Sequence, residues 1–255
     1  MPVNRKLYAR RITKERSPNW PCPRCGGGHL RLVRSSLHSC PTGDTHEQSS
    51  EDYFVEDMAV LRFVAMLKCD NDICQESSVV AGIGYYVEDW SYEVLDYREF
   101  YAPDYICPSP NLITIPPDTP STVTEQIEQA FIASWGAFSA AGNRIRVAAE
   151  RLMDSLKIPK TTTKNGRRKP LSLHSRIDKA QKKYPRIHRS LLAIKWLGNA
   201  GSHSTALTQE DVFDAFDIFE IVLEELYSQH FSTTESLVKQ INKRKGPVRK
   251  EAGKP

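Results

Sequence analysis

Six prolines fall within the single stretch "APDYICPSPNLITIPPDTPST", residues 102–122. Each proline fixes its own φ and lacks an amide N–H, so this stretch cannot form a long helix and favours extended backbone. The sequence on its two sides differs in character. β-branched and aromatic runs precede it, and helical periodicity follows it. We therefore predict an α+β chain of 255 residues, with a β-rich module followed by a helical one.

The changes in composition predict five segments. We expect a flexible basic arm (1–20), a β module (21–105), a proline-rich connector (106–120), a helical bundle (121–230) and a basic, disordered tail (231–255). No apolar run approaches the roughly 18 residues that span a membrane, and the basic N-terminus lacks the apolar core of a signal peptide. A cytoplasmic location is the expectation that follows.

Local patterns predict the elements within each module. Strands are expected at 30–33, 58–69, 77–87 and 92–101, and the polar stretch between the first two is expected to be a loop. The first helix should begin at Ser121 or Thr122, with Glu125 closing a capping box on Thr122. Further helices are expected at 137–156, 171–184, 187–197 and from Thr208 onward, and residues 157–170 should form a mobile basic loop.

Two pairs of cysteines are spaced like metal ligands. Cys22 and Cys25 lie in the tight turn CPRCGGG, and Cys69 and Cys74 lie in KCDNDIC directly after a predicted strand. Together they supply the four thiolates of a tetrahedral zinc ribbon, although four residues rather than two separate the second pair. We therefore predict a structural zinc ion that stabilises a module too small to fold on its core alone.

Other roles for the cysteines are less well supported. Four thiolates leave no open coordination position, which disfavours a catalytic zinc. Disulfides are disfavoured because nothing in the sequence indicates export from a reducing compartment. Cys40 together with His38 remains an alternative source of a ligand, and Cys107 is expected to be a lone thiol.

The net charge of +4 is distributed unevenly. Residues 41–104 carry 15 acidic and 3 basic side chains, a balance of −12, whereas residues 151–200 carry 14 basic and 2 acidic ones, a balance of +12. The second composition suits a polyanion, so we expect segment 151–200 to contact RNA or DNA. The alternative is that the acidic and basic surfaces pack against each other, with the acidic module covering a basic site.

The helical segment resembles a known family. The residues concerned, between Pro116 and Tyr227, include "PPDTPSTVTEQIEQAFIASWGAFSAAGNRIRVAAERLMDSLKIP", "LSLHSRIDKAQ" and "LLAIKWLGNAGSH". They resemble the bacterial domain-of-unknown-function family 4145, which looks like a branch of the HEPN superfamily of helical, nucleotide-binding domains. Members often carry an N-terminal cysteine-rich module. The resemblance implies a HEPN-like bundle, a homodimer through that bundle, and a role in anti-phage defence.

The resemblance also implies candidate catalytic residues. HEPN ribonucleases carry Arg, a polar residue, three further residues and His, and they cleave RNA without a metal. This sequence has Gly198-Asn199 followed by His203, so only Asn199 and His203 carry over and the arginine is missing. His203 would act as the general acid/base, since an imidazole titrates near neutral pH.

Other side chains are candidates for the missing cation. Lys195 lies one helical turn before Asn199 and should share its face, although an ammonium is a poorer phosphate clamp than a guanidinium. Arg146 and Glu150, in the R-x-x-x-E of the second helix, could orient His203 or simply pair with each other.

A purely structural interpretation of the motif is also open. Gly198 and Asn199 tolerate positive φ and could end a helix as C-cap residues, and His203 could hold a loop. We expect a HEPN-like module with a degenerate ribonuclease motif that binds nucleic acid in a defence-associated setting. The alternative is a metal-independent endoribonuclease that uses His203.

Overall fold

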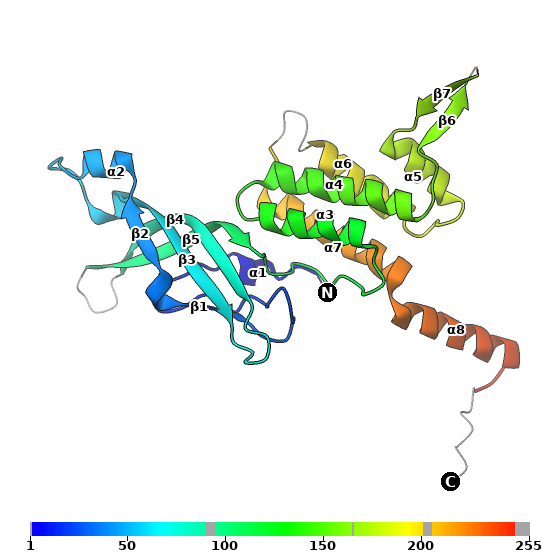
Figure 1. Ribbon diagram of the computed structural model, residues 1–255, viewed down its shortest axis with the longest axis horizontal. Helices are drawn as coiled ribbons and strands as arrows, with labels where there is room; N and C mark the ends of the chain where they lie inside the picture. Colours follow the sequence, from blue (N-terminus) through cyan, green and yellow to red (C-terminus); the bar gives the residue numbers. More distant parts are fainter. Residues whose placement is uncertain (1, 90–94, 165, 201–205, 248–255) are drawn as a thin grey trace, which may run out of the picture.

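The computed structural model describes residues 2–89, 95–164, 166–200 and 206–247. A β-rich half formed by the first part of the chain lies beside a helical half formed by the second, and the short helix α1 (Arg5–Tyr8) lies between them (Figure 1). The predicted α+β order is confirmed, with the strands first and the bundle helices after the proline-rich stretch.

An antiparallel sheet forms the β half. Its strand order is β1-β3-β4-β5, and β2 also pairs with β3. Burial alternates strictly along β3, because successive side chains of a strand point to opposite faces. The side chains on its inner face are buried, including Leu61, Phe63, Ala65 and Leu67. The strand bounds are β1 (Leu30–Leu32), β2 (His38–Pro41), β3 (Val60–Cys69), β4 (Ser77–Asp89) and β5 (Asp96–Cys107).

Two parts of the β half differ from the sequence expectation. The polar stretch expected to be a loop contains β2 and the helix α2 (Gly43–Gln48), which Thr42 caps by accepting a hydrogen bond from the Thr45 amide. The last strand begins later than expected and continues to Cys107, into the predicted connector. Pro103 is tolerated within it because β5 lies at the edge of the sheet, where one side of the strand needs no donor.

The helical half is a bundle in which α4 is central and packs against α3, α6 and α7. Buried residues recur along α4 at spacings of three and four, as predicted: Ala141, Ile145, Ala148, Leu152. The helix bounds are α3 (Ser121–Ala133), α4 (Phe138–Ser155), α5 (Leu173–Gln181), α6 (His188–Ala200), α7 (Gln209–Tyr227) and α8 (Gln229–Arg244).

Three expectations for the helical half are wrong. Helix α3 begins at Ser121, as expected, but it has no side-chain cap, and a capping box lies instead at Thr208 and Asp211 of α7. The basic stretch expected to be a loop forms a hairpin of β6 (Thr161–Lys164) and β7 (Arg167–Pro170). The tail expected to be disordered contains α8, which extends away from the bundle in Figure 1.

The basic arm is packed rather than flexible over residues 2–20. Tyr8 is buried, and its ring lies 5.8 Å from that of Trp135 and 6.0 Å from that of Phe213. Ile12 is fully buried and exchanges backbone hydrogen bonds with Tyr101 of β5. The arm is packed because apolar side chains lie between its charged residues, and burial of these side chains against both halves is favourable.

A cationic side chain adds to this packing. Arg5 donates to three carboxylates of α7, Glu210 at 2.7 Å, Asp214 at 2.5 Å and Asp217 at 2.9 Å. Trp20 at the end of the arm contacts Trp135 edge-on, with 5.1 Å between ring centroids. The arm therefore ties the β half to the helical half.

A search of the described residues finds no helix with the length and apolarity that crossing a membrane requires.

Truncation of a buried arm residue tests this packing. We expect Ile12→Ala to lower the free energy of unfolding by about 2–5 kcal/mol, because it leaves a cavity in a close-packed core. Chemical denaturation measures the change, and Lys6→Ala, at an exposed position of the same arm, is the control. Equal stability of the two variants would show that the arm is not part of the core.

Candidate functional site

Four cysteine thiols meet at one end of the β half. The Sγ atoms of Cys22, Cys25, Cys69 and Cys74 all lie within 4.8 Å of one another. Cys69 is the last residue of β3, and Leu30 of β1 pairs with it, so the sheet register brings the first turn beside the second. Cys40 and Cys107 lie outside the cluster, which is the four-cysteine set that the sequence predicted.

Backbone geometry around the thiols is specific. Gly28 has no room for a side chain, because a Cβ atom there would lie 2.6 Å from the Sγ of Cys69. The Gly28 amide donates to the Sγ of Cys25 at 3.4 Å, and the Asn71 amide donates to the Sγ of Cys69 at 3.4 Å. Amide donors aimed at sulfur stabilise thiolates, so both turns are arranged around negatively charged sulfur.

The thiols differ in acidity. The Gly28 amide is the main cause that lowers the pKa of Cys25 to about 7, whereas desolvation raises the pKa of Cys69 to about 12. Desolvation also raises the pKa of Cys22. Four thiolates this close repel one another unless a cation lies between them, so without a cation the cluster keeps protons at Cys22 and Cys69 near neutral pH.

The sulfur spacing fits one tetrahedral metal ion. Sulfur ligands at about 2.3 Å from a tetrahedral zinc lie about 3.8 Å apart. Two of the sulfur pairs are at that spacing, with Cys22 and Cys74 at 3.7 Å and Cys25 and Cys69 at 3.8 Å. Four thiols at these distances could hold a metal ion and leave no coordination position for a substrate.

A second candidate site is a cleft between α4, α5 and α6. Its volume is about 360 Å³, and three residues singled out in the sequence line it, Arg146, Lys195 and Asn199. Lys195 and Asn199 share one side of α6, as their spacing of four predicted. Arg146 lies across from them on α4 and pairs with Glu150 at 3.2 Å, so the predicted pair within the helix is present.

Donors and an aromatic ring surround this cleft. The Nε of Arg146 is buried and has no hydrogen-bond partner within the described structure. The Lys195 ammonium lies 3.1 Å from the ring centroid of Trp196, a side chain that is 59% exposed. Ser172, the N-cap of α5, lies in the lining together with Leu173 and His174. Positive charge and the N-terminus of a helix favour an anion.

Gly198 has a packing role that the sequence did not indicate. It lies inside α6 without positive φ, so the C-cap interpretation is wrong for this residue. A Cβ atom at Gly198 would lie 2.6 Å from the Cβ of Arg146 and 3.1 Å from the carbonyl oxygen of Gly142. The close approach of α4 and α6 therefore excludes any side chain at position 198.

Sequence reasoning assigned some of this site and missed the rest. His203 lies outside the described residues. His174 and Trp196 were not assigned, although Trp196 directly follows Lys195 in the sequence. The contact between them, with 6.2 Å between ring centroids, depends on how α5 and α6 pack, which spacing along one helix does not reveal.

The fold and these sites define a two-part protein, with a cysteine-clustered β half and a helical half that has a cationic cleft. Residues 126–244 match the family model described as Domain of unknown function (DUF4145), in agreement with the resemblance of the helical segment. Residues 10–109 match a second model, Domain of unknown function (DUF8608), which includes the end of the arm and all four clustered cysteines. No curated protein and no solved structure matches the chain.

Substitution of Gly198 tests the helix crossing. Gly→Ala inside a helix normally stabilises by about 1 kcal/mol, but here the added methyl group meets Arg146. We expect Gly198→Ala to destabilise the protein by about 1–3 kcal/mol through overpacking, and Gly198→Arg to destabilise it more. Thermal unfolding measures both effects. Gly43→Ala is the control because a Cβ atom there meets nothing within 4 Å, and an unchanged Tm for Gly198→Ala would contradict the crossing.

Proposed function

We propose that the helical half binds RNA or DNA through the cleft between α4, α5 and α6, and that it does not cleave the bound strand. The observation that carries this proposal is that the guanidinium-bearing Arg146, the ammonium-bearing Lys195 and the amide-bearing Asn199 line one cleft. A phosphate group accepts hydrogen bonds from such donors, and a guanidinium suits its geometry.

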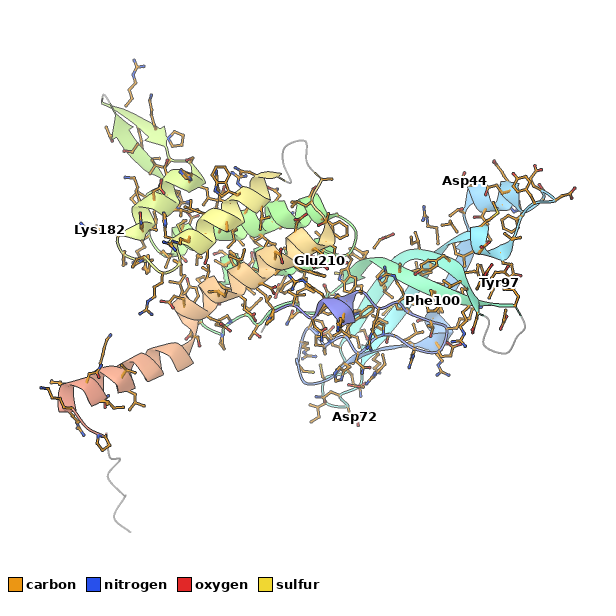
Figure 2. All side chains as sticks on the ribbon, turned by 180° about the vertical axis from the view of Figure 1, so that it is seen from behind. Asp44, Asp72, Tyr97, Phe100, Lys182 and Glu210 are labelled. Carbon is orange, nitrogen blue, oxygen red and sulfur yellow. The ribbon has the colours of Figure 1, made fainter. Side chains whose placement is uncertain are left out.

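The surface beside the cleft extends the positive charge. Strand β7 ends two residues before Ser172, so the β6–β7 hairpin emerges next to the cleft. Arg167, Arg168 and Lys169 of the hairpin are exposed, and Lys182 is exposed on the same half, at the opposite end of the molecule from Asp44 (Figure 2). A strand of nucleic acid that occupies the cleft with one phosphate contacts further cations along the hairpin.

Salt-dependent binding tests this proposal. We expect fluorescence polarisation with a labelled single-stranded RNA to show affinity that falls steeply with salt, because bound phosphates release counterions. Removal of two phosphate contacts by Arg167→Ala with Lys169→Ala should reduce the magnitude of the slope of log K against log salt by about 1.4. The control removes two cations from the arm, Lys6→Ala with Arg10→Ala. Equal slopes in all variants would contradict the hairpin's role.

Zinc is the metal that we propose for the cysteine cluster, with Cys22, Cys25, Cys69 and Cys74 as ligands and a purely structural role. The sulfur spacing and the amide donors to sulfur support this assignment. The metal would hold β1, which has three residues, and the two cysteine turns against the end of β3.

Metal analysis across pH tests the zinc assignment. We expect one zinc ion per chain in wild type and none in Cys25→Ser, while Cys107→Ser, outside the cluster, keeps the metal. Zinc affinity should rise with pH, because binding displaces protons that Cys69 and Cys22 hold in the free cluster. Competition with a chromophoric chelator measures the affinity, and a pH-independent value would contradict thiolate ligation.

A metal-independent endoribonuclease is the second candidate function. One observation favours it: Arg146 and Lys195, both candidate replacements for the missing arginine, line the same cleft as Asn199. In this mechanism His203 would take the proton from a ribose 2′-hydroxyl while a cation offsets charge on the phosphate. The two functions differ in the effect of His203→Ala, which abolishes cleavage in the second and leaves binding nearly normal in the first.

We also propose that two copies of the chain form a dimer through the helical bundle. An exposed apolar side chain on α7 of the bundle, Ile221 (59%), supports this contact. We also propose a role in anti-phage defence, and the family resemblance alone supports that role.

A further inference from the structure

The outward face of the β sheet is apolar although it is exposed. We call this surface the outer face and define it by the outward-pointing residues of β3, β4 and β5. Its main members, with their exposed fractions, are Val60 (39%), Val64 (50%), Met66 (36%), Val79 (45%) and Tyr105 (45%). Ile83, Tyr85 and Phe100 are partly exposed beside them.

The strand register makes these residues one continuous surface. Val64 pairs with Ala81, which pairs with Tyr105, and Met66 pairs with Val79. Directly paired residues of an antiparallel sheet point to the same face, so the side chains form adjoining rows. Tyr85 and Phe100 stack at 6.3 Å and extend the surface toward Val60.

A sheet that is apolar on both faces needs a cover on each. The inner face is buried in the core, as Phe63 and Leu67 show. An antiparallel sheet with one solvated face normally alternates apolar and polar residues, and large exposed apolar patches mark interaction surfaces. The outer face therefore has the composition of an interface.

The charges on the outer face indicate an acidic occupant. Arg62 and Lys68 project from it between the apolar residues of β3, and neither has an ion-pair partner among the described residues. The same face of a second copy is a poor occupant in a head-on arrangement, because its cations would oppose these cations.

The same chain contains a segment that is complementary to the outer face, with carboxylates for its cations and apolar side chains for its apolar residues. Residues 51–58, "EDYFVEDM", carry four carboxylates and expose Tyr53 (64%), Val55 (49%) and Met58 (42%). We call them the acidic segment. It leads into Val60 at one end of the outer face, so a two-fold axis near that end would place each copy's segment over the other's face. Nucleic acid fits less well, because these carboxylates would repel it.

The size of the surface is adequate for a specific contact. The nine residues from Val60 to Lys68 on each of three strands cover about 400 Å², from a rise of about 3.4 Å per residue and a strand spacing of about 4.8 Å. Two reciprocal contacts that cover this face completely bury up to about 1,600 Å² in total, which is typical of a specific complex.

We propose that two copies of this chain associate through their β halves, with the acidic segment of each copy on the outer face of the other. The contact is separate from the nucleic-acid cleft and from the dimer proposed through the bundle. Both of its surfaces lie within the β half.

Complementary charge reversal tests the proposal. The face variant carries Arg62→Glu and Lys68→Glu, and the segment variant carries Glu56→Lys and Asp57→Lys; both use the full, zinc-replete chain. Sedimentation velocity over a concentration series measures self-association of each variant and of an equimolar mixture. Lys179→Glu with Lys182→Glu, exposed on α5 and just beyond it, is a control with the same change in net charge as the face variant.

The proposal predicts a specific pattern of results. Each variant alone should self-associate at least about tenfold more weakly than wild type, because the attraction between opposite charges is then lost at both contacts. The mixture should regain most of that affinity, because one contact in a mixed pair is wild type and the other has both charges reversed. A monomeric wild type, equal association of all variants, or a mixture no stronger than its components would overturn the proposal.

Discussion

The close approach of α4 and α6 determines what the helical half can do. At this crossing Gly198 faces the Cβ of Arg146 and the carbonyl of Gly142, with no room for a side chain. The same approach places Arg146 across the cleft from Lys195 and Asn199. The geometry that gathers Arg146 and Lys195 around the cleft thus also leaves position 198 without room for a side chain. Under the proposed function this cleft holds a phosphate, and cleavage would require a cation other than one at position 198.

The halves of the chain are joined by apolar contacts rather than by their opposite charges. Tyr8 and Trp20 of the arm pack on Trp135, and Arg5 bonds to α7. The acidic and basic regions lie instead toward opposite ends, with Asp44 on one and Lys182 on the other (Figure 2). The alternative in which the acidic half covers the basic half therefore does not apply within one chain. The acidic surface and the basic surface are both available to partners.

The features that could be predicted from the sequence are those that depend on only a few neighbouring residues. The cysteine spacings, the Arg146–Glu150 pair and the buried positions of α4 follow from the geometry of turns and helices. It failed where distant contacts decide, because the role of Gly198 and the packing of the arm depend on parts of the chain far away in sequence. The β6–β7 hairpin could have been predicted from the sequence. The stretch "TKNGRR" contains an Asn-Gly pair, which is typical of a hairpin turn, and Gly166 has the positive φ that such a turn requires.

The function that we propose is binding of a nucleic-acid strand in this cleft without cleavage. A single-turnover assay tests this function, with protein in excess over end-labelled RNAs and a chelator present to exclude metal-dependent nucleases. We expect retarded but intact RNA in wild type and in His203→Ala alike. Fragments with cyclic phosphate ends that form with wild type and not with His203→Ala would contradict it, and would show that another cation replaces the arginine excluded at Gly198.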